Sequence, residues 1–83
     1  MEILNSEEVM PTTKGFSSAI VDLRTEQGLS RAQLAVYADI GIGALERVEQ
    51  CKQPPSLKTL LCISEVLDVS LDDIVEKAHD ADQ

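Results

Sequence analysis

Residues 28–50 read GLSRAQLAVYADIGIGALERVEQ, and this stretch decides the fold of the 83-residue chain. Gly28 is predicted to end one helix, because glycine readily adopts the left-handed conformation that follows many helices. Ser30 and Gln33 then match a capping box, in which the serine hydroxyl caps a new helix and the glutamine reaches back to the serine amide. A tight turn at residues 38–41 is predicted to separate this short helix from another at about 42–50.

Apolar residues recur at helical spacing on both sides of this stretch. Before it, the spacing i, i+3, i+4, i+7, i+11 predicts a helix from Gly15. After it, Lys52-Gln53-Pro54-Pro55 excludes helix. Ser56 then starts a helix over 57–67, and Ser70 starts one from 71 to about Lys77. The predicted inward-facing positions are Phe16, Ala19, Ile20, Leu23, Gln27, Leu34, Ala35, Ala38, Leu45, Val48, Leu57, Leu60, Leu61, Ser64 and Leu67.

Five short helices predict an all-α fold, with a helix-turn-helix formed by the second and third. We expect three segments: an acidic N-terminal arm (1–14), the helical domain (15–77) and a fraying C-terminal tail (78–83). Hydrophobic residues make up 43% of the chain and aromatic residues only 2%. A core of Leu, Ile, Val and Ala suits helices packed on helices. A domain this small favours a binding module over an enzyme with a large cleft.

Charge is distributed unevenly along the chain. The net charge is −8, from 15 acidic and 7 basic residues, which argues against non-specific nucleic-acid binding. Residues 15–53, however, carry five acidic and four basic residues, whereas residues 54–83 carry seven acidic and two basic ones. The acidity therefore lies at the two ends, where it could attract a protein partner, and the centre is nearly neutral.

Sequence signals for metals, cofactors and membranes are missing. Cys51 and Cys62 have no clustered histidine or cysteine partners, so no zinc site is predicted. Gly41-Ile42-Gly43 follows no strand and lacks a third glycine, so it is not a dinucleotide fingerprint, and no cofactor is expected. The first ten residues hold three Glu and no basic residue, unlike a signal peptide. With no apolar run long enough to span a bilayer, we expect a cytoplasmic protein without a membrane partner.

A set of short motifs, in order and at the right spacing, resembles the lambda-repressor-like (Cro/CI or XRE-type) helix-turn-helix family over residues 16–76. The motifs are Leu23-Arg24, Gly28-Leu29-Ser30, Gln33-Leu34-Ala35, Arg47-Val48-Glu49, Pro55-Ser56-Leu57, Thr59-Leu60 and Leu67-Asp68-Val69-Ser70-Leu71-Asp72. The resemblance implies a five-helix DNA-binding domain whose second helix rests on a phosphate and whose third enters the major groove. It also implies an ion pair between Arg24 and Glu49 that ties the first helix to the third.

The same resemblance implies which residues meet DNA. At the start of the second helix, Arg31 matches a phosphate contact, and Gln33 either joins it or only caps the helix. The residues that match base-reading positions are Ile42, Gly43 and Arg47, and those near phosphate are Gly41, Ala44, Gln50 and Lys52. Arg47 could bind the O6 and N7 atoms of guanine, and Ile42 and Ala44 could touch thymine methyls. Glu46 could accept a hydrogen bond from cytosine N4, although near phosphates a carboxylate is usually unfavourable.

The sequence departs from the family pattern at three places. Asp39 stands where the turn usually has glycine, and Cys51 replaces the glycine that usually follows the third helix. The first turn of that helix is Gly-Ile-Gly-Ala, where polar residues are typical.

The two leading hypotheses follow from the resemblance and from these departures. The first is a sequence-specific, DNA-binding transcription regulator, expected to be a repressor, although the sequence does not decide between repression and activation; it acts as a homodimer on a palindromic operator. The alternative is an interaction module that kept the fold but binds little or no DNA.

The predicted fifth helix suggests where a second subunit would bind. It offers four apolar residues, Leu71, Ile74, Val75 and Ala78, more than one small core is expected to use. Ile74 or Val75 is therefore predicted to make the dimer contact, unless all four pack internally.

Overall fold

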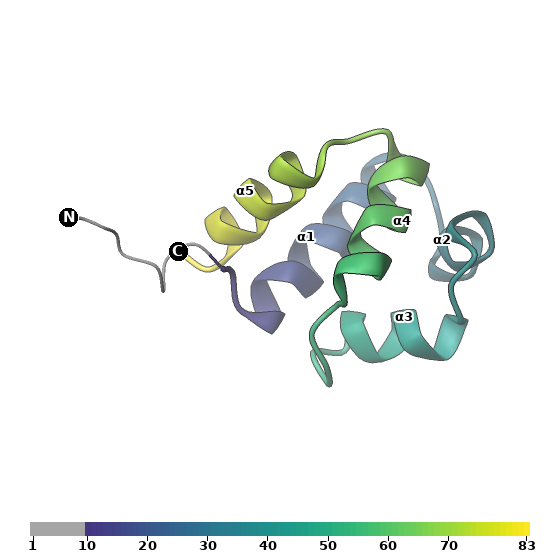
Figure 1. The fold of residues 1–83 in the computed structure, drawn as a ribbon, viewed down its shortest axis with the longest axis horizontal. Helices are drawn as coiled ribbons and strands as arrows, with labels where there is room; N and C mark the ends of the chain where they lie inside the picture. The colour runs from purple at the N-terminus through teal and green to yellow at the C-terminus, as the bar shows by residue number, and fades with distance from the viewer. Residues whose placement is uncertain (1–9) are drawn as a thin grey trace.

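Hydroxyl side chains set the start of four of the five helices in the computed structural model, which describes residues 10–83. The helices are α1 (Thr13–Glu26), α2 (Arg31–Ala38), α3 (Ile42–Glu49), α4 (Leu57–Leu67) and α5 (Leu71–Ala81) (Figure 1). In each of the four, the hydroxyl accepts a hydrogen bond from the backbone amide three residues further on, and these caps are Thr12, Ser30, Ser56 and Ser70. No strand occurs in residues 10–83, so the predicted all-α fold is confirmed.

Four of the helices end in the same way, on a residue with left-handed backbone conformation. These residues are Gly28, Asp39, Cys51 and Asp68, with φ of 73°, 56°, 62° and 55°. In each case the next residue donates its amide to a carbonyl five residues back, as Leu29 does to Arg24 at 2.9 Å and Lys52 to Arg47 at 2.8 Å. This is the Schellman geometry, which satisfies carbonyls that the helix end leaves free. The tight turn predicted at residues 38–41 is therefore present, and Cys51 adopts the left-handed conformation although it is not glycine.

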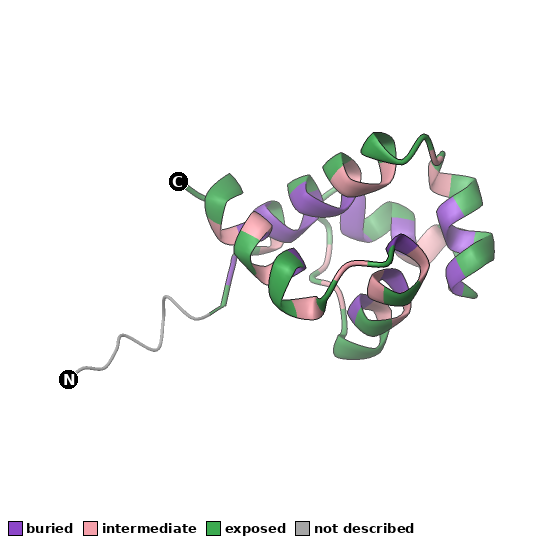
Figure 2. Ribbon diagram, turned by 90° about the horizontal axis from the view of Figure 1, so that it is seen from above, coloured by how far each residue is buried: buried purple, intermediate pink, exposed green. Residues whose placement is uncertain are grey.

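The helices pack in a fixed order around one core. Helix α5 lies alongside α1, α2 packs against α3 and α4, and α3 also meets α1 (Figure 1). Each of the five helices contains buried residues, which Figure 2 marks along the ribbon. The apolar residues of the core are Phe16, Ala19, Ile20, Leu34, Ala35, Ala38, Leu45, Val48, Leu60, Ile63, Leu67, Ile74 and Ala78. This arrangement leaves the outer faces of α2 and α3 free for contact with a partner.

Both ends of the domain differ from their predicted positions. Helix α1 begins at Thr13, two residues before its expected start, and α5 continues to Ala81, beyond the expected end at Lys77. Most of the predicted tail belongs to α5, and Asp82 beyond it accepts hydrogen bonds from the Thr12 amide at 2.8 Å and the Thr12 hydroxyl at 2.6 Å. Residues 1–9 of the predicted arm, and any acidic contact they make, lie outside the described residues.

Gly15 lets α1 and α5 approach closely at this end. A Cβ placed on it would lie only 2.6 Å from the Ala78 carbonyl oxygen and from an Asp82 carboxylate oxygen. A side chain at this position would therefore push the two helices apart.

The predicted inward face of α4 is partly wrong. Leu57 and Leu61 were expected to be buried, but their exposed fractions are 63% and 46%. The helix instead buries Leu60, Ile63 and Leu67, which follow the spacing i, i+3, i+7. In an apolar helix such as α4, the spacing of apolar residues does not determine which of two faces is buried. Packing against α2 and α5 determines it.

The predicted dimer contact at Ile74 is also wrong. Its side chain is fully buried, with 0% exposed, because α5 lies along α1 and turns Ile74 and Ala78 into the core. Leu71 and Val75 are partly buried and pack against the same core. Of the two predicted contacts, Val75 alone retains some surface, and its role in a dimer stays a prediction.

Candidate nucleic-acid interface

The helix-turn-helix is built by local signals at three consecutive points. At the start of α2 the capping box is complete: the Ser30 hydroxyl accepts from the Gln33 amide at 3.1 Å, and the Ser30 amide donates to Gln33 Oε1 at 2.9 Å. At the end of α2 the left-handed Asp39 turns the chain, and the Ile40 amide donates to the Ala35 carbonyl at 3.0 Å. Gly41 then starts α3 without a side-chain cap.

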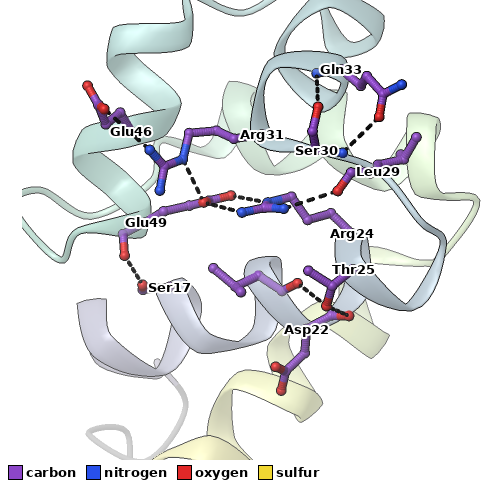
Figure 3. Close-up of polar contacts among 11 residues, drawn as sticks. Ser17, Asp22, Arg24, Thr25, Leu29, Ser30, Arg31, Gln33, Glu46 and Glu49 are labelled. Atoms are coloured by element: carbon purple, nitrogen blue, oxygen red, sulfur yellow. Dashed lines mark hydrogen bonds and ion pairs between the residues drawn. The ribbon is translucent and has the colours of Figure 1, made fainter.

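Glu49, at the end of α3, holds the first three helices together (Figure 3). Its side chain is only 1% exposed. Arg24 from α1 donates to it twice, from Nε to Oε2 at 2.7 Å and from Nη2 to Oε1 at 2.9 Å. Arg31 from α2 donates Nε to the same Oε1 at 2.9 Å. The predicted Arg24–Glu49 ion pair is thus present, and the structure adds Arg31 to it.

This network changes how easily Glu49 gains a proton. Burial alone would raise the pKa of Glu49, but the hydrogen bonds from Arg24 and Arg31, followed by the charges of these arginines, outweigh it, so the pKa lies below its ordinary value. The hydrogen bond to Glu49 likewise raises the pKa of Arg24. The carboxylate is therefore ionised at neutral pH, and it fixes the angle between α1, α2 and α3.

Arg31 and Gln33 both have partners inside the domain. Besides Glu49, Arg31 donates Nη1 to Glu46 of α3 at 3.3 Å, and its side chain is 33% exposed. Gln33 uses Oε1 in the capping box, so only its amide nitrogen is left to donate to another molecule. A phosphate contact by Arg31 would have to compete with Glu46, whose carboxylate is half exposed.

The outer face of α3 matches the predicted face at five of its seven positions. Leu45 and Val48 are buried at 0% and 2%, which turns the opposite side of the helix to solvent. The exposed residues on that side are Gly41, Ile42, Glu46, Arg47 and Gln50. Gly43 and Ala44 are only partly exposed, so a DNA contact by either of them would come mainly from backbone atoms or a methyl group. Lys52, just beyond the helix, is exposed as predicted.

Arg47 differs from the other two arginines in having no carboxylate partner within residues 10–83. Its Nε donates to Oε1 of Gln53, a neutral amide, at 3.2 Å. Within the same residues, no hydrogen bond engages its Nη1 or Nη2. On the outer face of α3 the guanidinium is therefore not neutralised by a carboxylate of these residues, and both of its terminal nitrogens are free to donate.

Besides the contacts of Arg31 with Glu49 and Glu46, sequence reasoning missed three polar contacts that shape this region. The Ser17 hydroxyl of α1, buried at 6% exposure, donates to the Glu49 carbonyl at 2.6 Å. Gln27 donates Nε2 to the Leu67 carbonyl at the end of α4, at 2.7 Å. Gln53, the partner of Arg47, follows the helix in a segment that the sequence marks only as non-helical. Each contact joins residues on separate elements, and no periodic pattern signals such a pair.

Other kinds of site are not found in the described part of the chain. In residues 10–83, no group of three or more His, Cys, Asp or Glu side chains could hold a metal ion. None of the helices there is long and apolar enough to cross a bilayer. A shallow depression of about 280 Å³ lies between α1 and the end of α3, lined in part by Lys14, Asp22 and Cys51. It does not include the outer face of α3.

Comparison with known proteins places this geometry in a family. A helix-turn-helix family matches residues 20–74. The fold resembles the restriction-modification controller protein C.AhdI from Aeromonas hydrophila (26% identity, TM-score 0.71, 75% of this chain and 94% of that one). It also resembles the clp gene regulator ClgR from Corynebacterium glutamicum (20%, TM-score 0.77, 83% and 73%). The third similar structure is that of a Y37A mutant of the restriction-modification controller protein C.Esp1396I (24% identity, TM-score 0.73, 80% of this chain and 86% of that one). No curated protein matches the sequence.

The fold and the exposed third helix define a class, the XRE-type helix-turn-helix regulators, which bind DNA and are not enzymes. The chain belongs to this helix-turn-helix family, as the match over residues 20–74 shows. The resemblance predicted from the short sequence motifs is thereby confirmed.

Proposed function

We propose that the protein is a sequence-specific transcription regulator that acts as a homodimer on a palindromic operator. One observation carries the proposal: within residues 10–83, Arg47 stands on the outer face of α3 without a carboxylate partner, while Arg24 and Arg31 are held by Glu49. An arginine with both terminal nitrogens free can bind O6 and N7 of guanine, the commonest specific contact in the major groove.

The remaining contacts follow from positions on and around α3. Ile42, 53% exposed, is proposed to contact a thymine methyl. Gly41, Gln50 and Lys52 lie exposed at the two ends of the helix, where phosphates flank the groove. Gly43 and Ala44 allow the helix backbone to approach DNA closely. At the start of α2, Arg31 and the Gln33 amide nitrogen are proposed phosphate contacts.

Glu46 is proposed to limit DNA affinity unless a cytosine amino group faces it. Its carboxylate is 51% exposed and lies 3.3 Å from Arg31. It therefore repels phosphates and also holds an arginine that would otherwise bind one. Together with the net charge of −8, this keeps non-specific binding weak.

A homodimer on a two-fold operator is proposed because one domain of this type reads only half a site. Because Ile74 is buried, we place the proposed contact surface on other residues. The apolar side chains Leu57 and Leu61 of α4 lie one turn apart, are 63% and 46% exposed, and form the proposed surface for a second copy. Val75 remains a proposed contact beside it. Repression is the proposed mode, since occupancy of the operator is enough for it, and the expected location is the cytoplasm.

The test is a pair of substitutions with different signatures. Arg47→Ala should weaken operator binding by about 1–3 kcal/mol and relax preference at one base pair in each half-site. Lys52→Ala should weaken all sequences alike and reduce the salt slope by about one unit. Fluorescence anisotropy titrations over a range of salt concentrations measure both effects. Unchanged preference in Arg47→Ala would count against base reading by α3.

A second candidate function is a protein-interaction module with little or no DNA binding. The acidic net charge favours it, as do the exposed apolar side chains on α2, Val36 at 74% and Tyr37 at 60%. The titrations separate the two candidates. Under this alternative no DNA sequence binds even at low salt, and Arg47→Ala has no effect on any of them.

A further inference from the structure

We infer that Gln53 is a positioning residue for base recognition: it fixes the guanidinium of Arg47 so that Nη1 and Nη2 face the DNA together. The inference rests on the proposed function and deepens it, because it names what sets the specificity of the reading arginine. The observation behind it is the 3.2 Å hydrogen bond from Arg47 Nε to Gln53 Oε1.

The hydrogen bond matters because its donor is Nε of Arg47 and not Nη1 or Nη2. A guanidinium can bind two acceptors side by side through Nη1 and Nη2, or through Nε and one Nη. The other two arginines of the domain use Nε: Arg24 binds Glu49 through Nε and Nη2, and Arg31 binds it through Nε. Gln53 occupies the Nε of Arg47 in the free protein. It thereby leaves the Nη1/Nη2 edge as the one available for guanine.

The backbone holds Gln53 at the place where it can do this. Cys51 turns the chain back on α3 in the left-handed conformation, and the Lys52 amide donates to the carbonyl of Arg47 itself at 2.8 Å. Pro54 restricts Gln53, the residue before it, to extended backbone conformations. Gln53 is also partly buried, whereas Arg47 is exposed. The acceptor is thus attached to a constrained turn, and the flexible partner is the arginine.

Gly43 supplies the opposite boundary. Side chains on a helix lean toward its N-terminus, so Arg47 lies back over the residue one turn before it. A Cβ on Gly43 would be 3.5 Å from Arg47 Nη1, an ordinary van der Waals contact. The guanidinium therefore lies between the surface of Gly43 and the amide oxygen of Gln53. An alanine at position 43 would therefore touch the guanidinium without displacing it.

The test compares the wild type with two variants at position 53. Gln53→Met keeps the length of the side chain but has no oxygen acceptor, whereas Gln53→Glu restores an acceptor at the same place. The first readout is NMR of the free protein, which needs no DNA. Hydrogen exchange of Arg47 Nε–H should become about two- to tenfold faster in Gln53→Met, the change expected for losing one hydrogen bond, and should remain slow in Gln53→Glu.

The second readout is discrimination at the base pair that Arg47 reads. Discrimination is measured as the ratio of the dissociation constants for the changed and the preferred base pair. This ratio should be about two- to tenfold smaller in Gln53→Met than in wild type. Gln53→Glu should keep that ratio while binding every sequence more weakly, because its charge repels phosphates. In an Arg47→Ala background, Gln53→Met should have no further effect. A thermal melt of each variant checks that the fold is unchanged.

The outcomes distinguish this inference from the function on which it rests. If exchange at Arg47 Nε is the same in wild type and Gln53→Met, the positioning role is wrong, whatever the protein binds. If exchange changes but discrimination does not, Gln53 orders the free arginine and has no part in specificity, which also overturns the inference while DNA binding stands. If the wild type shows no sequence preference at all, the proposed function fails, and the role of Gln53 in base recognition fails with it.

Discussion

Glu49 is the residue that links α3 to both α1 and α2. It is almost fully buried, and it is bound by one arginine from α1 and another from α2. A buried carboxylate needs such partners, since an uncompensated charge is strongly destabilising in the interior. The two arginines are not equivalent, however: Arg24 contacts both carboxylate oxygens, while Arg31 contacts one and remains a third exposed.

Replacing the two arginines should therefore have unequal effects on stability. Arg24→Ala should lower the free energy of unfolding by about 3–5 kcal/mol, because it removes the bidentate partner of a buried charge. Arg31→Ala should lower it by about 1 kcal/mol or less, since Arg24 still pairs with both oxygens. Urea denaturation of the two variants measures the difference. Equal losses would mean that the two arginines share the carboxylate evenly.

The lowered pKa of Glu49 predicts a specific pH dependence. A carboxylate whose pKa is depressed in the folded state stabilises the protein above its unfolded pKa of about 4.3, and this contribution is lost as the pH falls through the folded value. The loss of unfolding free energy in Glu49→Gln should thus be largest at neutral pH and shrink below about pH 4. Other carboxylates, including Asp82, are present in both wild type and Glu49→Gln, so their contributions to the pH dependence cancel in the difference. A difference between wild type and Glu49→Gln that stays constant from pH 7 to 3 would contradict it.

At the scale of the helices, one device recurs: a residue in left-handed conformation followed by an amide that caps the helix end. Glycine fills this position only once, at Gly28, and Asp39, Cys51 and Asp68 fill it elsewhere. Aspartate tolerates the left-handed region better than most residues, whereas cysteine has no such advantage. The turn after α3, which carries Lys52 and Gln53, is therefore kept under mild backbone strain.

Relieving that strain should stabilise the domain. Cys51→Gly should raise the free energy of unfolding by about 1 kcal/mol, since the left-handed conformation costs a non-glycine residue roughly that amount. The matched control is Cys51→Ala, which removes the exposed thiol but keeps a Cβ, and it should leave stability nearly unchanged. Thermal melts compare the three proteins. A gain of the same size in both variants would assign the effect to the sulfur instead of the backbone.

At the scale of the molecule, the sequence predicts what local chemistry decides and misses what packing decides. The capping serines, the turn at Asp39 and the buried face of α3 depend on neighbouring residues, so their patterns are visible in the sequence. The burial of Ile74 and the exposure of Leu61 depend on which helix each element meets. The pairing of Arg31 with Glu49, and of Arg47 with Gln53, depends on side-chain geometry between elements. The candidate site is therefore predictable in position but not in its electrostatics.

The exposure of Leu57 and Leu61 and the burial of Ile74 lead us to expect different effects of substitutions at these positions on dimer formation. Leu57→Glu combined with Leu61→Glu should give a monomer that keeps its helical circular dichroism, because both side chains are exposed in the single chain. Ile74→Glu should instead unfold the domain, since it places a charge in the core. Sedimentation equilibrium at micromolar concentrations measures the association of wild type and of the double variant. A double variant that associates as strongly as wild type would exclude the α4 surface from the dimer.

The measurement that tests the central claim most directly is selection of bound duplexes from a random DNA pool, run in parallel with wild type and Arg47→Ala. We expect wild type to enrich a palindrome with a guanine at the same place in each half-site, and Arg47→Ala to lose the preference for that base alone. Enrichment of no sequence by wild type, even at low salt, would contradict the account and leave the interaction module in its place.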